Sequence, residues 1–295
     1  MITIIIPTVG RIESLRSLLK SLVETDNRRQ VEHEVLVVNN ATERELPAQV
    51  SMLADEFGRT TDLPVRCLRE PVPGKSRAVN RAIAFARGSV LAFLDDDVVV
   101  GCGWLSGVRD FFLHHEFDAM QGAILFPPGK EADVEFLRVW NRYRTIVHVN
   151  YGENVKDFHK LTGANFAIRR QVIERVGLFD ERIGPGQTGT SEDSQFGKKL
   201  LKSGLRIGYA PQARVYHEID SSRLTHDYFR RQHEAQGVSR QTYKKNSVLR
   251  IVPDLCWAIA NWGWYSLLKN ERGVYRSEAR VYHYRAMLTQ WFCSR

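Results

Sequence analysis

Three consecutive aspartates, Asp95, Asp96 and Asp97, follow the apolar run VLAFL at residues 90–94. A buried strand has no place for three carboxylates, because an unpaired buried charge is strongly unfavourable. Two close carboxylates also raise each other's pKa unless a cation lies between them. Mg²⁺ and Mn²⁺ bind one or two carboxylates together with phosphate oxygens. The run therefore predicts a divalent-metal and phosphate site at a strand end.

The orientation of the three carboxylates follows from the geometry of an extended chain, in which residues i and i+2 point to the same side. Asp95 and Asp97 are thus expected to face the metal together, with Asp96 pointing elsewhere. An alternative is an N-cap cluster in which Asp97 precedes a helix. Three carboxylates exceed what a cap requires, and VVV at 98–100 is a poor helix start.

A second acidic group, Glu192-Asp193, lies between the glycine-rich loop GPGQTG and an expected helix. A carboxylate at such a position suits a general base that deprotonates an attacking hydroxyl. The structural alternative is a capping box with Ser191 as the N-cap, and both roles are compatible. Cations gather after the PVPG turn, where Lys75 and Arg77 begin an expected helix and form a natural phosphate site.

The first two thirds of the chain alternate strand-like and helix-like patterns, which predicts an α/β fold with a mainly parallel sheet. Ligands of such sheets bind beyond the carboxyl ends of the strands, here the loops PTVGR, NNAT and DDD. We expect Pro7 to end the first strand and Gly88 to cap a helix. Strands are predicted at 2–6, 34–40, 65–68, 89–97, 119–126 and 206–218; helices at about 15–22, 78–86, 104–115, 132–147 and 195–204, with another after LTGANFAIRR.

Charge and tryptophan are concentrated in the last quarter of the 295-residue chain. Residues 221–295 hold 13 lysines and arginines against 5 acidic residues and four of the six tryptophans, whereas residues 1–220 are neutral overall. This predicts a domain over 1–220 and a basic, tryptophan-rich helical extension over 221–295. The apolar stretch 255–268 is shorter than the roughly 20 residues of a membrane span. It is typical of an interfacial helix on anionic lipid, or of a helix packed on the catalytic body.

Several classes are disfavoured by composition. The cysteines Cys67, Cys102, Cys256 and Cys293 show no metal-ligand or disulfide spacing, which favours a reducing compartment. The start MITIIIPTVGR lacks the basic region of a signal peptide, so a cytoplasmic location, with peripheral contact at the cytoplasmic face of the membrane, is expected. No nucleic-acid-binding motif is present in the sequence, and we expect no nucleic-acid partner.

The ordered set TIIIPTVGR, EVLVVNN, GKSRAVNRAIAFARG, VLAFLDDD, LTGANFAIRR, TSED and VYHE resembles a family 2 glycosyltransferase. The resemblance covers about residues 1–220 and implies the GT-A fold, with a Rossmann-like sheet and helices on both faces. It implies an inverting transfer of a sugar from a nucleoside diphosphate donor, with Mn²⁺ or Mg²⁺ as cofactor.

By this resemblance Asp193 is the catalytic base, Asp97 and His217 are metal ligands, and Asp95 or Asp96 approaches the donor ribose. The extended geometry adds Asp95 to the expected metal ligands. A lone histidine would otherwise be more typical of a packed residue than of a ligand. Two small residues before Asn165 would let the backbone approach a ligand closely, although a tight strand connection explains them equally well. The expected donor-binding residues are Pro7, Thr8, Arg11, Asn39, Asn40, Lys75, Arg77, Asn80, Asp95, Asp96, Gly163, Ala164, Asn165 and Glu192.

Two departures from the family pattern limit what the resemblance implies. Asn39 and Asn40 stand where an aspartate usually contacts the nucleobase, which leaves UDP, GDP and dTDP donors open. RRQHEAQG at 230–237 replaces the QxxRW motif of processive members, so a single addition is expected.

The expected function is therefore metal-dependent transfer of a sugar to an acceptor hydroxyl in polysaccharide, glycolipid or other glycoconjugate synthesis, with a lipid-linked acceptor compatible with the extension. One alternative is a sugar nucleotidyltransferase, for which the PTVGR loop is too short. Another is a non-catalytic module that binds nucleotide sugars, against which the intact DDD and SED segments argue.

Overall fold

The computed structural model describes residues 1–24 and 31–293, which form two compact units. Unit 1 consists of residues 1–127, 148–181 and 192–218, and unit 2 of residues 128–147, 182–191 and 219–295. Unit 1 ends close to the boundary predicted near residue 220. Nothing in the composition had indicated that 128–147 and 182–191 group with the tail, and the functional division into two domains stays a prediction.

Unit 1 is built on a nine-stranded sheet of order β3-β2-β1-β4-β8-β6-β9-β5, with β7 paired to β9. The strands β3, β2, β1, β4, β6 and β9 run in one direction, while β8, β5 and β7 run against them. The predicted mainly parallel central sheet is thus confirmed. The strands are β1 (Ile2–Thr8), β2 (His33–Asn39), β3 (Val65–Arg69), β4 (Val90–Leu94), β5 (Val98–Val100), β6 (Ala119–Leu125), β7 (Lys156–Phe158), β8 (Asn165–Arg169) and β9 (Ile207–His217).

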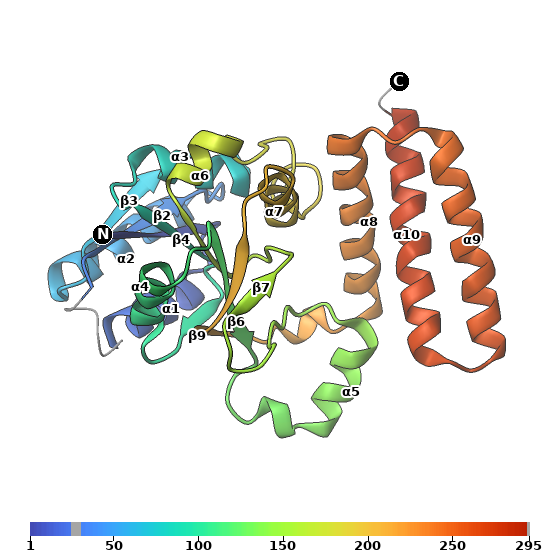
Figure 1. The fold of residues 1–295 in the computed structure, drawn as a ribbon, viewed down its shortest axis with the longest axis horizontal. Coiled ribbons are helices and arrows are strands. Elements are labelled where there is room, and N and C mark those ends of the chain that lie inside the picture. The colour runs from blue at the N-terminus through green and yellow to red at the C-terminus, as the bar shows by residue number, and fades with distance from the viewer. Residues whose placement is uncertain (25–30, 294–295) are drawn as a thin grey trace. The chain divides into compact units, whose positions relative to one another are not determined.

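Helices cover both faces of this sheet, with α3, α6 and α7 on one face and α1 and α4 on the other (Figure 1). Alternation along the strands produces the two layers: Ile5 joins the α3–α7 core, whereas its buried neighbours Ile4 and Ile6 point the other way. The helices of unit 1 are α1 (Ile12–Glu24), α2 (Leu46–Thr60), α3 (Lys75–Phe85), α4 (Trp104–His114), α6 (Gln171–Val176) and α7 (Glu192–Lys202).

Four phenylalanines form the centre of the core between the sheet and the α3–α7 layer. The rings of Phe93 and Phe166 stack with centroids 4.5 Å apart, and those of Phe179 and Phe196 with centroids 4.0 Å apart. Offset-stacked rings add to the free energy of area burial, and dense packing leaves little freedom to shift. The strand ends therefore stand on a rigid base.

Pro7 was predicted to end a strand and Gly88 to cap a helix, and both have other roles in the structure. β1 continues through Pro7 to Thr8, because its pairing with β4 ends at Ile5 and no ladder on that side needs the missing N–H. Gly88 is not a helix cap, since α3 ends at Phe85. A Cβ at Gly88 would lie 2.5 Å from the backbone nitrogen of Thr3, so the position requires glycine for close approach.

Unit 2 is helical, which confirms the predicted C-terminal helices. Its long helices α8, α10 and α9 lie side by side with α10 in the middle (Figure 1). A Cβ at Gly237 of α8 would lie 2.2 Å from the carbonyl oxygen of His283 in α10, so these two backbones are in close contact. The helices are η2 (Lys130–Ala132), α5 (Val134–Tyr143), η3 (Ser221–Arg223), α8 (His226–Lys244), α9 (Val248–Leu267) and α10 (Glu271–Cys293).

Glu34 is a buried carboxylate near the amino ends of β1, β2 and β3, where it joins three segments of the chain. It accepts hydrogen bonds from Thr3 Oγ1 at 2.8 Å, from the Arg87 amide at 2.6 Å and from Arg66 at 2.8 Å. Burial alone would raise its pKa, but these donors outweigh burial and lower the pKa. The ionised form is therefore the one that stabilises the fold.

Replacing Glu34 with Gln should lower the free energy of unfolding at pH 7 by about 1–3 kcal/mol, because charge-assisted bonds are lost and an amide donor faces other donors. Urea unfolding followed by circular dichroism measures the change. Since the folded pKa is lowered, the stabilisation is complete above the unfolded pKa of about 4.3 and disappears as the pH falls through the folded pKa. An equal difference between wild type and variant at pH 7 and in strong acid would contradict this role.

Candidate functional site

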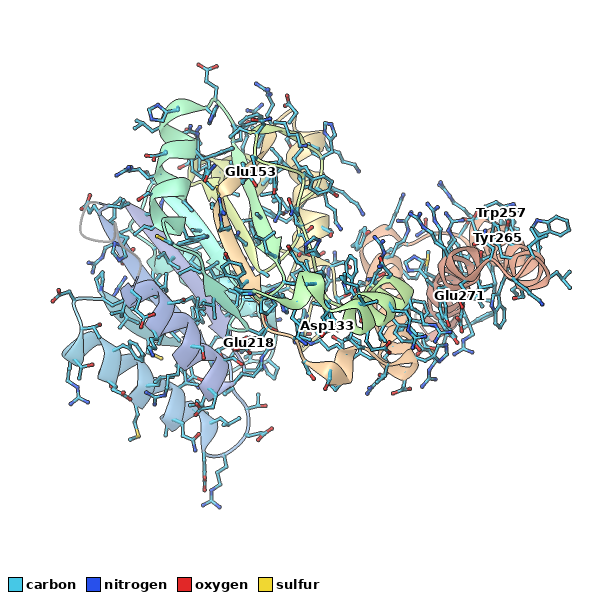
Figure 2. The ribbon with its side chains drawn as sticks, turned by 90° about the horizontal axis from the view of Figure 1, so that it is seen from below. Asp133, Glu153, Glu218, Trp257, Tyr265 and Glu271 are labelled. Carbon is cyan, nitrogen blue, oxygen red and sulfur yellow. The ribbon has the colours of Figure 1, made fainter. Side chains whose placement is uncertain are left out.

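The candidate site lies at the sheet edge where β1, β4 and β9 end. These strands run in one direction, so the residues that follow Thr8, Leu94 and His217 gather at one edge. β5 begins directly after the aspartates and pairs antiparallel with β9, placing Val98 opposite His217. The Glu218 amide donates to the Asp97 carbonyl at 2.9 Å, and Figure 2 labels Glu218 at this end of β9.

The three aspartates are divided between two cations. Arg11 binds Asp96 at 2.8 Å and Asp97 at 2.6 Å, and Thr8 Oγ1 donates to Asp96 at 2.6 Å. Asp95 instead pairs with Lys75 at 2.6 Å. The predicted same-side placement of Asp95 and Asp97 is wrong, because the chain turns at Asp96 and Asp97 rather than staying extended.

The pKa of Asp96 is raised to about 6, mainly by burial and also by the neighbouring charges of Asp97 and Asp95. Arg11 and Thr8 act in the opposite direction and lower it. Five carboxylates lie at this edge, and ion pairs or charge interactions within the described residues join them to Arg11 and Lys75: Asp95, Asp96, Asp97, Glu192 and Asp193. Carboxylates gathered in this way are the groups whose charge a divalent cation neutralises.

His217 is buried beside Asp97 in an orientation that suits a metal ligand. Its Nδ1 lies 2.7 Å from the Glu218 carbonyl oxygen, which can only accept, so Nδ1 carries the proton. Its Nε2 lies 3.6 Å from Asp97 Oδ1, too far for a direct hydrogen bond. A carboxylate and an imidazole nitrogen placed in this way fit two ligands of one divalent ion.

The described part of the chain holds no group of three or more histidine, cysteine, aspartate or glutamate side chains that could form a metal cage. A two-residue set agrees with the chemistry of Mg²⁺-type sites, which keep waters and phosphate oxygens in the remaining positions. The donor set thus fits a metal that binds together with a diphosphate.

Lys75, the first residue of α3, connects the aspartate turn to α7. Its Nζ lies 2.6 Å from Asp95 and 3.2 Å from Glu192 at the start of α7. Burial alone would lower the pKa of Lys75, but Asp95, Glu192 and Asp193 outweigh burial and raise it well above the ordinary value. Burial also raises the pKa of Glu192, against the attraction of Lys75. One ammonium group thus holds the half-buried Asp95 and the buried Glu192.

Asp193 is oriented by backbone donors rather than by a cation. Its Oδ2 accepts from the Gly163 amide and its Oδ1 from the Ser194 amide, and no salt bridge to Asp193 occurs within the described residues. The adjacent Ala164 has a φ of 78°, a left-handed conformation that costs energy in a residue with a Cβ. A hollow of about 20 Å³ is lined by Pro7, Lys75, Asp95, Ala164, Glu192 and Asp193, among others.

The four asparagines predicted to bind the donor use their amides within the protein. Asn40 donates to the carbonyls of Glu70 and Val72 and accepts from the Gly74 amide, so it holds the turn before α3. Asn39, Asn80 and Asn165 make comparable bonds to neighbouring backbone. These side chains therefore shape the loops around the site.

Two carboxylates at this edge were not predicted from the sequence. Glu218 accepts from Ser14 Oγ at 2.6 Å, and its position directly after VYH was the available signal. Glu181 pairs with Arg77 at 2.8 Å and accepts from Asn80. Arg77 thus binds this carboxylate and not the aspartates, whereas Thr8, Arg11, Lys75, Glu192 and His217 do meet as expected.

One family model matches more than half of the chain. The profile described as glycosyl transferase family 2 matches residues 3–177, and the chain belongs to this family.

Among characterised relatives, the chain is 28% identical over 235 residues to the O-antigen biosynthesis protein RfbC of Myxococcus xanthus, covering 75% of this chain and 18% of that protein. It is 23% identical over 222 residues to the glucosyl-dolichyl phosphate glucuronosyltransferase of Haloferax volcanii, covering 70% of this chain and 66% of that protein. The chain therefore spans less than two thirds of the length of each.

Solved structures show the same fold. The mannosyltransferase PcManGT of Pyrobaculum calidifontis, in complex with GDP-Man and Mn²⁺, aligns with a TM-score of 0.63 at 19% identity over 100% of this chain and 87% of that one. S. aureus TarS 1–349 in complex with UDP-GlcNAc aligns with a TM-score of 0.55 at 15% identity over 99% and 91%. The GT-A fold predicted from the sequence is thereby confirmed.

Replacing Lys75 with Met should lower the free energy of unfolding by about 2–4 kcal/mol, because Asp95 and the buried Glu192 lose their shared cation. Denaturant unfolding at neutral pH measures the change. Arg77→Met is the matched control on the same helix, since its half-exposed pair with Glu181 should contribute at most about 1 kcal/mol. Equal losses in the two variants would argue against Lys75 as the central cation.

Proposed function

We propose that the protein is an inverting, metal-dependent glycosyltransferase that moves a sugar from a nucleoside diphosphate donor to an acceptor hydroxyl. The observation that carries the proposal is the meeting of Asp97, His217, Lys75 and Asp193 at one sheet edge. The relatives include enzymes named for sugar transfer, and neighbours of the same fold bind GDP-Man or UDP-GlcNAc.

The donor end of the proposed site is formed by Asp97 and His217, which would hold Mn²⁺ or Mg²⁺; the ion would supply charge neutralisation for the departing diphosphate. Arg11 pairs with Asp96 and Asp97, and its guanidinium group would also bind phosphate oxygens of the donor. Lys75 fixes Asp95 for contact with the ribose or sugar.

Asp193 is the proposed general base. Its two amide donors orient the carboxylate, and the lack of a salt bridge among described residues leaves its charge available for an acceptor proton. One base is sufficient for inversion, because the acceptor oxygen attacks the anomeric carbon as the diphosphate leaves and no covalent sugar–enzyme step is required. Single addition, rather than processive synthesis, is part of the proposal.

The roles of Asp97 and Asp193 predict opposite defects. Asp97→Ala should abolish the Mn²⁺-dependent rise in melting temperature on adding a nucleotide sugar, because the metal loses its carboxylate. Asp193→Asn should keep this rise but reduce turnover by about 10²-fold or more, since the base is absent. Thermal shift with UDP-, GDP- and dTDP-sugars, followed by a transfer assay with the donor that binds, measures both.

Normal turnover by Asp193→Asn would contradict the base assignment, and retention of the sugar's anomeric configuration in the NMR spectrum of the product would contradict inversion. Pyrophosphate release from a nucleoside triphosphate would favour a nucleotidyltransferase instead. Donor binding without turnover on any acceptor would favour a binding module.

We further propose peripheral membrane contact through α9, in agreement with a lipid-linked acceptor. This 20-residue helix has only Arg250 and Asp254 as charged residues, and its exposed side chains include Trp257, Trp264 and Leu267. Figure 2 labels Trp257 on this helix. Exposed tryptophans on a helix with few charges are typical of the bilayer interface. Within the residues described, no helix has the length and hydropathy to span a bilayer.

Replacing both Trp264 and Leu267 with Ser should reduce co-sedimentation with phosphatidylcholine–phosphatidylglycerol vesicles by about tenfold or more, because roughly 2 kcal/mol of apolar burial is lost per large side chain. Met52→Ser/Leu113→Ser is the control, since it removes comparably exposed apolar residues from unit 1. Equal vesicle binding by wild type and both double variants would exclude α9 as the contact.

A further inference from the structure

Unit 2 contains a hollow of about 450 Å³ whose lining is strongly basic. The walls come from the end of α5, from α8 and from the first half of α10. Five arginines line it, Arg142, Arg144, Arg272, Arg276 and Arg280, and no acidic residue is among its described lining. A hollow of this size accommodates a small ligand, and its charge selects an anion.

These five arginines form no salt bridge with any described residue, in contrast to other arginines of the same helices. Arg230 and Arg231 pair with Asp227, and Arg285 pairs with Glu234. The nearby Glu278 is engaged by His226 and Tyr282. Gathering like charges around one hollow is unfavourable for folding in the absence of an anion. The arrangement therefore has the character of a binding site rather than of a structural network.

Aromatic rings hold three of the guanidinium groups in place. Arg142 stacks over Tyr275 at 4.9 Å, Arg144 over Trp140 at 4.8 Å and Arg280 over Trp257 at 5.3 Å, measured to the ring centroids. A guanidinium held over a ring can still donate from the N–H groups that point away from the ring. Arg144 uses one of its N–H groups for Asn141 Oδ1 at 3.1 Å and has others left for a ligand. Such preorganisation lowers the entropy lost when an anion binds.

We propose that this hollow binds a phosphoryl group, as a phosphate monoester or a diphosphate. Several guanidinium groups match a ligand that carries two or more charges and several acceptor oxygens, which arginine binds in a bidentate manner. A single carboxylate would neutralise only one of the five. The site is separate from the proposed donor site, because all its lining residues belong to unit 2 and it needs neither a metal nor Asp193.

The test uses the full-length protein in EDTA at constant ionic strength, which removes metal-dependent donor binding and fixes screening. Calorimetric titration with inorganic diphosphate gives the first dissociation constant. The second arm is co-sedimentation with phosphatidylcholine vesicles that contain phosphatidic acid, compared with vesicles of equal charge that contain phosphatidylserine.

Arg272→Gln/Arg276→Gln should weaken binding by about tenfold or more, measured with whichever of the two probes the wild type binds, diphosphate or phosphatidic acid vesicles. Both side chains are exposed and unstacked, so the variant should fold. Arg240→Gln/Lys202→Gln is the control of equal charge change, because neither residue lines the hollow, lies on α9 or forms a salt bridge among the described residues; it should change affinity less than about twofold.

If Arg272→Gln/Arg276→Gln weakens the binding of diphosphate and the wild type does not prefer phosphatidic acid vesicles, the ligand is a soluble phosphate. If the wild type prefers phosphatidic acid vesicles and the variant loses this preference, the ligand is a lipid headgroup. Absence of binding to either probe, binding that Arg272→Gln/Arg276→Gln leaves unchanged, or an equal loss in the control variant would overturn the proposal. None of these outcomes depends on sugar transfer, so a failure here is distinct from a failure of the glycosyltransferase assignment.

Discussion

The ion pairs of Lys75 with Asp95 and Glu192 are the interactions on which the rest of the site depends. They join the turn after β4, the start of α3 and the start of α7, three segments far apart in sequence. Burial raises the pKa of Glu192, and the Lys75 ammonium group offsets its charge, so the acidic edge can exist within a dense protein. The same pairs place Asp193, the neighbour of Glu192, within the same hollow.

The sheet supplies the second constraint. Co-directional strands deliver Thr8, the aspartate turn and His217 to one edge, and stacked phenylalanines beneath keep that edge rigid. The antiparallel β5 then turns the chain back along β9, which brings Asp97 beside His217. The proximity of Asp97 and His217 at this edge is thus a consequence of strand direction.

Local patterns sufficed where a segment's structure is set by its own residues: the apolar runs predicted β1, β2 and β4, and the three aspartates indicated the candidate site after β4. They gave no indication of the partners that folding brings from a distance. Arg77 lies two residues beyond Lys75, so on a helix it points to another side and meets Glu181. The asparagine amides are satisfied by carbonyls that only the folded chain brings near. The short β5 carries no periodicity of its own.

The path of the chain between the two units has a consequence for how this protein could have been assembled and shared. The chain passes from one unit to the other after residues 127, 147, 181, 191 and 218. A module that is connected by one linker can be exchanged among proteins as a single block of sequence. Unit 2 cannot, because its segments are interleaved with those of unit 1, and one passage directly precedes Glu192. The arginine-lined hollow and the acidic edge are therefore inherited together, as parts of a single continuous sequence.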